Sequence, residues 1–141
     1  MIRASSLGGC TKGLVAAALG MKAIPPDQAS LLRMGEGQIH EDDVVARLTN
    51  DGYEITRQQE LVVLDCGVGI VEGHLDGVLN GDPFTPTGPK VLEIKSMGRD
   101  PFKTFKTKGW DEGGLIDKYK YQLSVNMLST GLEALLVAKT R

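Results

Sequence analysis

The sequence predicts one α+β domain, in which a central mixed β-sheet is flanked by helices in an α/β/α arrangement. Two helical patterns come first, β-branched segments with a period of two fill the middle, and a helix and a strand close the chain. With 141 residues, 41% of them hydrophobic and 24% charged, the chain can bury a globular core. Because no repeat or linker divides it, we expect a single domain over residues 1–141.

The first predicted helix is short. Ser5 or Ser6 is expected to cap it, and it runs through Cys10 to Leu19 before Gly20 ends it. A second and longer helix follows a pair of prolines.

Asp27 supplies the N-cap of this longer helix, which reaches Asn50. Gly35 and Gly37 weaken its pattern, so we expect a local break or kink there.

Beyond Gly52 the pattern changes to alternating β-branched residues, which predicts three strands. They cover Tyr53–Thr56 with Glu60–Leu64, then Val68–Leu79, then Val91–Lys95. The turn-rich segment 80–89 between the last two predicts an antiparallel hairpin.

The last part of the chain begins with residues 97–113, which we expect to form an irregular loop. A helix is predicted over Leu115–Ser129, with Gly131 ending it, and a strand over Ala134–Ala138.

Three charged residues lie in the predicted hairpin. Antiparallel pairing lets Asp76 and Glu93 lie on neighbouring strands facing one side, and alternation puts Lys95 on the face of Glu93. Burying such charges is costly unless something binds them, and a divalent cation with a phosphodiester would do so. Carboxylate oxygens favour Mg²⁺ or Mn²⁺. The alternative is that these charges lie on an edge strand, exposed to water, and bind nothing.

Two further candidates lie on the long helix. His40 is in register with Val44 and Leu48 on its apolar stripe, whereas Glu41 shares that face less fully. An inward histidine is equally a satisfied core residue.

The late helix carries Gln122 between the flanking Tyr119 and Tyr121, which are candidates to face the same cleft. An amphipathic core helix explains the tyrosines nearly as well. His74 alternates with Asp76 on its strand and is expected to pack near the site rather than bind a metal.

The charge distribution favours a nucleic-acid partner more than the net charge of −2 does. Residues 90–120 hold eight basic and five acidic residues, a net +3 that leaves −5 for the remainder. Aromatic and basic residues interleave there, which suits stacking on a base and holding phosphate; they are Lys103, Phe105, Lys106, Lys108 and Trp110. A solvated lysine-rich loop with one buried tryptophan is the equal alternative.

The two cysteines, Cys10 and Cys66, lie far apart and form no metal-ligand spacing. No secretory leader and no apolar run long enough to span a bilayer is visible. We therefore expect reduced thiols, a cytoplasmic location and no membrane partner.

Together these motifs resemble the PD-(D/E)xK nuclease superfamily, and most closely its RecB-like and phage-exonuclease branch. The shared pattern is Asp76, a hairpin, the Glu-x-Lys of Glu93 and Lys95, and a later helix bearing Gln122. The upstream counterpart is the segment Gly35–Glu41, and the opening Ser-x-Leu-x-x-Cys is similar to that of CRISPR-associated members. The likeness spans residues 5–139. No cysteine follows Cys66, so the iron–sulfur cluster of some members is excluded.

The resemblance implies a restriction-endonuclease-like core and assigns roles to the candidates. Asp76, Glu93 and the backbone carbonyl of Ile94 would bind the metal, joined by His40 as in the RecB-like branch. In the phage exonucleases a glutamate at the next position takes that part, and here Glu41 is expected to serve a second metal or the water. Lys95 would orient or deprotonate the attacking water with a lowered pKa. Gln122 would contact the lysine or a phosphate.

The expected function is therefore a Mg²⁺- or Mn²⁺-dependent deoxyribonuclease. We expect an exonuclease of phage or bacterial recombination or repair, acting on DNA as a homo-oligomer or with a larger partner. An endonuclease of restriction or resolvase type and a non-catalytic nuclease-like DNA-binding protein are the alternatives.

Overall fold

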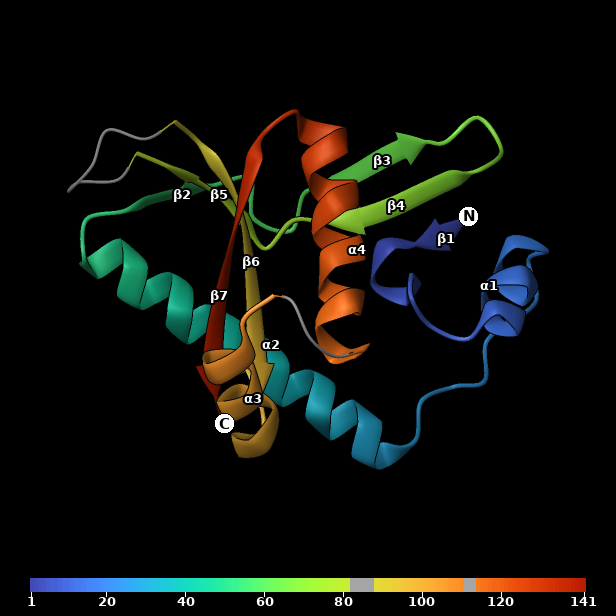
Figure 1. Cartoon of the computed structure of the whole chain (residues 1–141), viewed down its shortest axis with the longest axis horizontal. Coiled ribbons are helices and arrows are strands. Elements are labelled where there is room, and N and C mark those ends of the chain that lie inside the picture. Colours follow the sequence, from blue (N-terminus) through green and yellow to red (C-terminus); the bar gives the residue numbers. More distant parts are fainter. Residues whose placement is uncertain (82–87, 111–113) are drawn as a thin grey trace.

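The computed structural model describes residues 1–81, 88–110 and 114–141, without the side chains of residues 114–116. Within that part of the chain, four α-helices flank two mixed β-sheets, an architecture compatible with the predicted α+β class (Figure 1). The elements are β1 Ile2–Arg3, the 3₁₀ helix η1 Ala4–Ser6, α1 Thr11–Ala18, α2 Gln28–Asn50, β2 Glu54–Thr56, β3 Leu61–Asp65, β4 Ile70–His74, β5 Gly77–Asn80, β6 Lys90–Met97, α3 Arg99–Lys108, α4 Gly114–Thr130 and β7 Glu133–Thr140.

The single central sheet predicted from the sequence is wrong. The described strands form one sheet in the order β1-β4-β3 and another in the order β2-β5-β6-β7. The expected strand Val68–Leu79 is interrupted at Leu75 and Asp76, so that β4 pairs with β3 while β5 pairs with β2 and β6. Each sheet mixes parallel and antiparallel pairs, because β1–β4 and β6–β7 are parallel.

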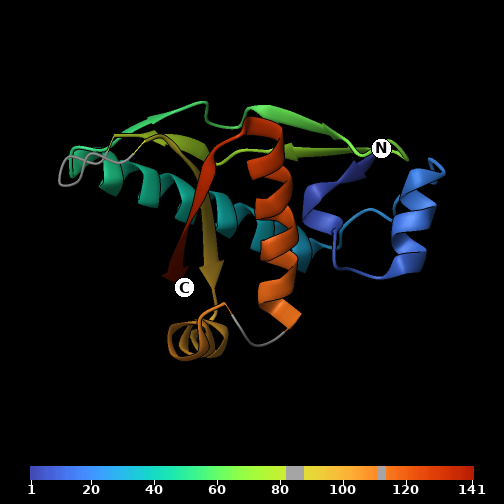
Figure 2. The ribbon, with the colours of Figure 1, turned by 45° about the horizontal axis from the view of Figure 1, so that its top comes forward.

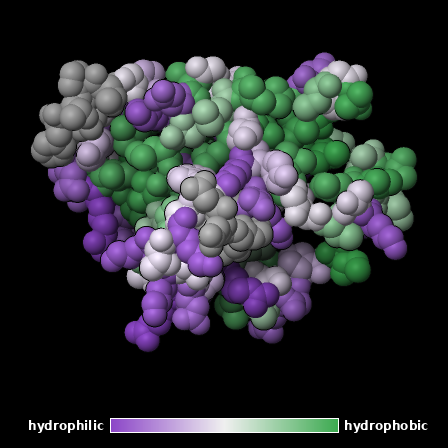
Figure 3. All heavy atoms as spheres, viewed as in Figure 1, coloured by the Kyte–Doolittle hydropathy of each residue, from purple (hydrophilic) through white to green (hydrophobic). Residues whose placement is uncertain are grey.

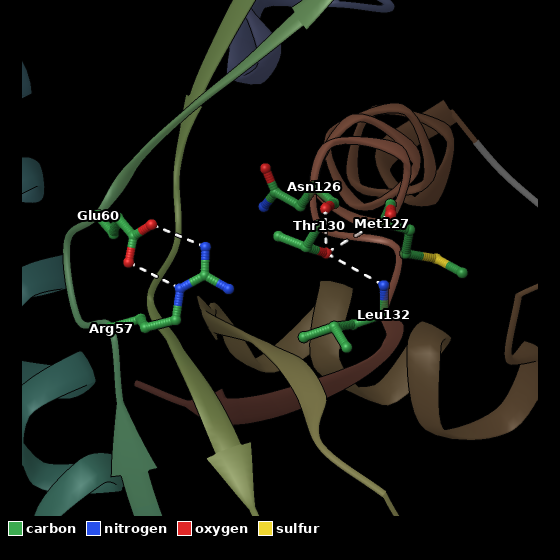
Figure 4. A network of polar contacts seen from close by, with 6 residues as sticks. All are labelled: Arg57, Glu60, Asn126, Met127, Thr130 and Leu132. Carbon is green, nitrogen blue, oxygen red and sulfur yellow. Dashed lines mark hydrogen bonds and ion pairs between the residues drawn. The ribbon is translucent and has the colours of Figure 1, made fainter.

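Two segments that pass between the sheets lie side by side: residues 57–60 after β2, and residues 75–76 between β4 and β5. The backbone N–H of Gln59 donates to the carbonyl of Leu75 at 2.8 Å, and the N–H of Leu75 donates to Glu60 at 3.0 Å. Arg57 closes the first connection with two 2.7 Å bonds to the Glu60 carboxylate (Figure 4). Arg57 and Gln59 both have positive φ, at 53° and 56°, a conformation in which side chains other than glycine are strained.

The predicted hairpin is present as the pair β5–β6, with Gly77 opposite Leu92 in antiparallel register. Most of its predicted turn, residues 82–87, lies outside the described part of the chain. Gly77 has no room for a side chain, because a Cβ there would lie 2.7 Å from Cγ2 of Ile55 on β2.

Helix α2 begins after the predicted cap, since the Asp27 carboxylate accepts from the Ser30 N–H at 2.8 Å. It then runs unbroken to Asn50, so the expected break at Gly35 and Gly37 is wrong. A Cβ at either glycine would meet nothing within 4 Å, so neither marks a point where another segment intrudes.

Strand β6 lies between α2 and α4 (Figures 1 and 2). Leu92 and Ile94 pack on the α2 side against Val44. By alternation, Glu93 and Lys95 face the α4 side.

Helix α4 ends as predicted, because Gly131 follows it with φ of 70° and donates its N–H to Met127 at 2.8 Å. The Thr130 hydroxyl donates to the carbonyl of Asn126 at 2.7 Å and accepts from the Leu132 N–H at 3.3 Å (Figure 4). This end of α4 is thereby fixed to the start of β7.

Two other sequence expectations need correction. Residues 99–108 form the helix α3 rather than an irregular loop, and residues 111–113 of the expected loop lie outside the described part. Pro101 fits because it stands in the first turn, where its missing N–H costs nothing. Cys10, not Ser5 or Ser6, precedes α1, because both serines belong to η1.

The surface differs between the two peripheral helices. In Figure 3, hydrophilic side chains gather over α3 and hydrophobic ones over α1. Val15 on α1 and Leu19 just after it are 53% and 75% exposed. No helix in the described residues is long and apolar enough to cross a bilayer.

Candidate functional site

The site begins where β4 crosses to β5. Asp76 stands in this crossing, half-buried, and its Oδ2 accepts a 2.6 Å hydrogen bond from the backbone N–H of Ile94 in the middle of β6. The bond ties the crossing to the strand that carries Glu93 and Lys95. The structure therefore brings the three charged residues of the predicted hairpin together.

Glu93 and Lys95 face each other on β6. Oε1 of Glu93 forms an ion pair with Nζ of Lys95, and Glu93 is 0% exposed while the lysine side chain is 20% exposed. The ammonium also lies 5.4 Å from the centre of the Tyr119 ring on α4, within the range of a cation–π contact. The ion pair of Glu93 and Lys95 is therefore largely shielded from solvent between β6 and α4.

Asn126 completes the surroundings of Glu93, and the sequence analysis missed it. Its Nδ2 donates to Oε2 of Glu93 at 3.2 Å, and both residues are 0% exposed. The available signal was its spacing of four from Gln122, which puts both amides on one face of a helix.

Of the two candidates on α2, the structure brings Glu41 to the site. Its carboxylate interacts electrostatically with Asp76 and Lys95, and its Oε1 accepts a 2.6 Å hydrogen bond from Nε2 of Gln59. The side chain of His40 is half-buried and makes no hydrogen bond or ion pair within the described residues. Its role as a metal ligand stays a prediction.

Burial, and for Glu41 and Glu93 repulsion from neighbouring carboxylates, raise the pKa of three carboxyl groups at the site. Burial, and to a smaller degree Asp76 nearby, raise the pKa of Glu93 to about 7 despite the opposing effect of Lys95. Burial and Asp76 likewise raise the pKa of Glu41 to about 7. Burial also raises the pKa of Asp76, while the Ile94 N–H works against this. The three carboxyl groups therefore hold protons more readily than free carboxyl groups do.

Among the protein groups alone, the pKa of the Lys95 ammonium is raised, the opposite of the lowering expected beside a metal. Burial alone would lower the pKa of its ammonium, but Glu93 and Asp76 outweigh that effect, and the pKa is raised. These neighbours therefore hold Lys95 as a positive charge.

A cleft of about 290 Å³ opens beside Asp76. Its polar lining includes Arg3, Ser5, Glu72, His74, Asp76 and Gln122. Gln122 on α4 therefore lies beside the site, where the sequence places the glutamine of the late helix. His74 lines the same cleft but ends β4, so it does not share a continuous strand face with Asp76 as expected.

Asp76 and Glu93 supply carboxylate oxygens, the kind of ligand that hard cations prefer. Within the described residues, no three His, Cys, Asp or Glu side chains form a group that could hold a metal ion. A set of two carboxylates, Asp76 and Glu93, with the backbone carbonyl of Ile94 does not need a third such side chain. The chemistry of Asp76, Glu93 and the Ile94 carbonyl therefore fits a hard cation.

The residues expected to contact nucleic acid lie on α3, just after its end at Trp110, and on α4. Lys103 and Lys106 lie exposed on α3 with Lys108, while Phe102 and Phe105 on the same helix are half-buried. Trp110 is 39% exposed, and its ring meets Phe105 edge to face with 6.0 Å between the centres.

The two tyrosines of α4 point to different places. Tyr119 lies beside Lys95, whereas Tyr121 is 51% exposed and packs against Gly8. A Cβ at Gly8 would lie only 2.9 Å from Cδ2 of Tyr121.

No protein family model, curated protein or solved structure matches this chain. Its chemistry is therefore inferred from the residues of the site.

Proposed function

We propose that this chain is a Mg²⁺- or Mn²⁺-dependent deoxyribonuclease with a PD-(D/E)xK-type site. The observation that supports this most is the bond from the Ile94 N–H to Asp76, which joins an aspartate to the strand carrying the Glu93–Lys95 ion pair. An acid on the crossing segment and an acid and a lysine two apart on the next strand form the motif of that superfamily.

Asp76 and Glu93 would hold the ion together with the carbonyl of Ile94. The ion supplies Lewis-acid stabilisation of a phosphodiester and lowers the pKa of water.

The chain's own groups supply the remaining chemistry. Lys95 keeps its proton and offsets negative charge that develops on phosphate. Glu41, with a pKa of about 7, can accept or release a proton near neutral pH. Gln122 offers an amide at the cleft beside Asp76, where a phosphate oxygen or the sugar would lie.

DNA is the proposed partner, held along the exposed lysines of α3. We favour an exonuclease of phage or bacterial recombination or repair. With 141 residues the chain has little surface for enclosing DNA, so we propose a homo-oligomer or a larger recombination partner.

The test uses Asp76→Ala and Lys95→Ala with end-labelled linear DNA and matched circular DNA, in Mg²⁺ and in Mn²⁺. Both variants should lose cleavage, and the wild type should prefer linear DNA. If both variants cut as fast as the wild type, this site is not the nuclease centre. If the wild type binds DNA but shows no heat of Mn²⁺ binding by calorimetry and no cleavage, the chain is a non-catalytic DNA-binding protein.

A further inference from the structure

Asn126 is the polar side chain of α4 that lies deepest against β6. It is 0% exposed, and the glutamate to which it donates is also 0% exposed. In Figure 4 its side chain extends from α4 on the side away from Met127. A polar pair so far from water must be held in one arrangement, because neither group can exchange its partner for solvent.

The two oxygens of the Glu93 carboxylate are each assigned to a partner. Oε2 accepts from Nδ2 of Asn126 at 3.2 Å, and Oε1 is paired with the ammonium of Lys95. A carboxylate accepts only, so the donor end of the amide must face it. Asn126 therefore fixes the rotation of the carboxylate and, through it, the oxygen that Lys95 meets.

The other end of the amide is fixed by shape. Oδ1 of Asn126 is buried without a hydrogen-bond partner among the described residues, and it lies against Gly73 on β4. A Cβ at Gly73 would lie 2.8 Å from Oδ1 and 3.3 Å from Cβ of Ala4, so only glycine leaves room for the amide. Burying an unpaired acceptor costs free energy, which an apolar residue at this position would avoid. The cost is offset only if the donor end does something that an apolar residue cannot do.

We propose that Asn126 is a positioning residue that aims the Glu93 carboxylate toward Lys95 and the proposed ion. The inference depends on the proposed function, but the contact itself can be tested without it. Asn126 does not touch the reacting atoms. It acts through Glu93, and Gly73 gives it the space to do so.

The main variant is Asn126→Leu, which keeps the number and branching of the side-chain heavy atoms and removes the donor. Thr130→Val is the matched control, because it removes a hydroxyl one turn later on α4 that bonds to the backbone of Asn126 and Leu132 and does not touch the Asn126 side chain or Glu93. For each protein, Mn²⁺ affinity is measured by calorimetry without DNA, stability by thermal melting, and kcat and KM on linear DNA.

Asn126→Leu should fold and weaken Mn²⁺ binding by about tenfold or more, the effect typical of losing a group that orients a metal ligand. Its kcat should fall by a similar factor while KM for DNA stays within about twofold, because the contact is remote from the DNA. Thr130→Val should melt earlier and leave Mn²⁺ affinity unchanged. An Asn126→Leu protein with wild-type Mn²⁺ affinity and kcat would overturn the proposal.

A second variant and a metal-free measurement keep the test decisive. If Asn126→Leu does not fold, Asn126→Ala is read in the same way, and failure of both to fold would assign Asn126 to the core and overturn the proposal. The side-chain amide signals of Asn126 in ¹H–¹⁵N spectra should shift in Glu93→Gln, where the charge on the acceptor is lost. That shift, with no Mn²⁺ binding by the wild type, would retain the contact and reject the proposed nuclease. Unshifted signals would reject the positioning contact.

Discussion

The carboxylate of Asp76 is bonded to the backbone of Ile94, the residue between Glu93 and Lys95, at 2.6 Å. One acid is thus attached to the strand that presents the other acid and the lysine, although 18 residues separate the bonded pair. The bond also joins the two sheets, because Asp76 lies in the segment that passes from β4 to β5.

Asp76→Asn should separate charge from shape at this position. Asparagine can still accept from the Ile94 N–H through its Oδ1, so the fold should persist. Since the substitution also removes a buried charge, the melting temperature should not fall. Cleavage of DNA should fall by at least about 100-fold, as expected when a charged group of a catalytic site is lost. The measurements are cleavage rates and thermal melting on the same preparation. Full activity in a stable Asp76→Asn protein would contradict the account.

Stability should fall as the pH rises from about 4.5 to about 7. Burial and Asp76 raise the pKa of Glu41 from 4.5 to about 7, so over this window the folded state holds a proton that the unfolded state has released. The free energy of unfolding therefore decreases with pH, and Glu93 acts in the same direction. Glu41→Gln should make the slope shallower without abolishing it. Urea unfolding between pH 4 and 8 measures both slopes, and equal slopes would show that Glu41 does not titrate in this way.

Two substitutions at Gln59 should differ in stability although both remove its amide. Gln59 has φ of 56°, where glycine is unstrained and alanine is not. Gln59→Gly should therefore be more stable than Gln59→Ala by about 1 kcal/mol. In both, the hydrogen bond to Glu41 is lost, and since that bond lowers the pKa of Glu41, the pKa should rise further. Urea unfolding compares the stabilities and carboxyl NMR follows the pKa; equal stabilities would argue against strain at this position.

The lysines of α3 should contribute to DNA affinity through charge. Lys103→Gln with Lys106→Gln should weaken binding and reduce the slope of log Kd against log salt by about 1 for each lysine. Lys12→Gln with Lys22→Gln removes the same charge from the region of α1 and is the matched control. Fluorescence anisotropy at several salt concentrations measures both pairs, and equal slopes would show that the surface of α3 is not a DNA contact.

Local signals in the sequence predicted the parts of the fold that depend on local chemistry. The Asp27 cap, the end of α2 at Asn50 and the β5–β6 pairing follow from capping, turn residues and alternation. Helix α3 was missed because only Phe102 and Phe105 mark its inner face among lysines.

The division into two sheets and the roles of Gln59 and Asn126 depend on contacts distant in sequence. The crossing at Leu75 and Asp76 is stabilised by bonds to Gln59 and Glu60, which no pattern within Val68–Leu79 records. Asn126 reaches Glu93 across 33 residues of sequence, so periodicity places it on an inner face without naming its partner.

The most direct test is a crystal structure of the protein with Mn²⁺, in which anomalous scattering locates the ion. The account predicts an ion bound by carboxylate oxygens of Asp76 and Glu93 at about 2.0–2.3 Å, with the carbonyl of Ile94 as a third ligand. An ion bound elsewhere, while the carboxylates of Asp76 and Glu93 keep only their protein partners, would contradict it.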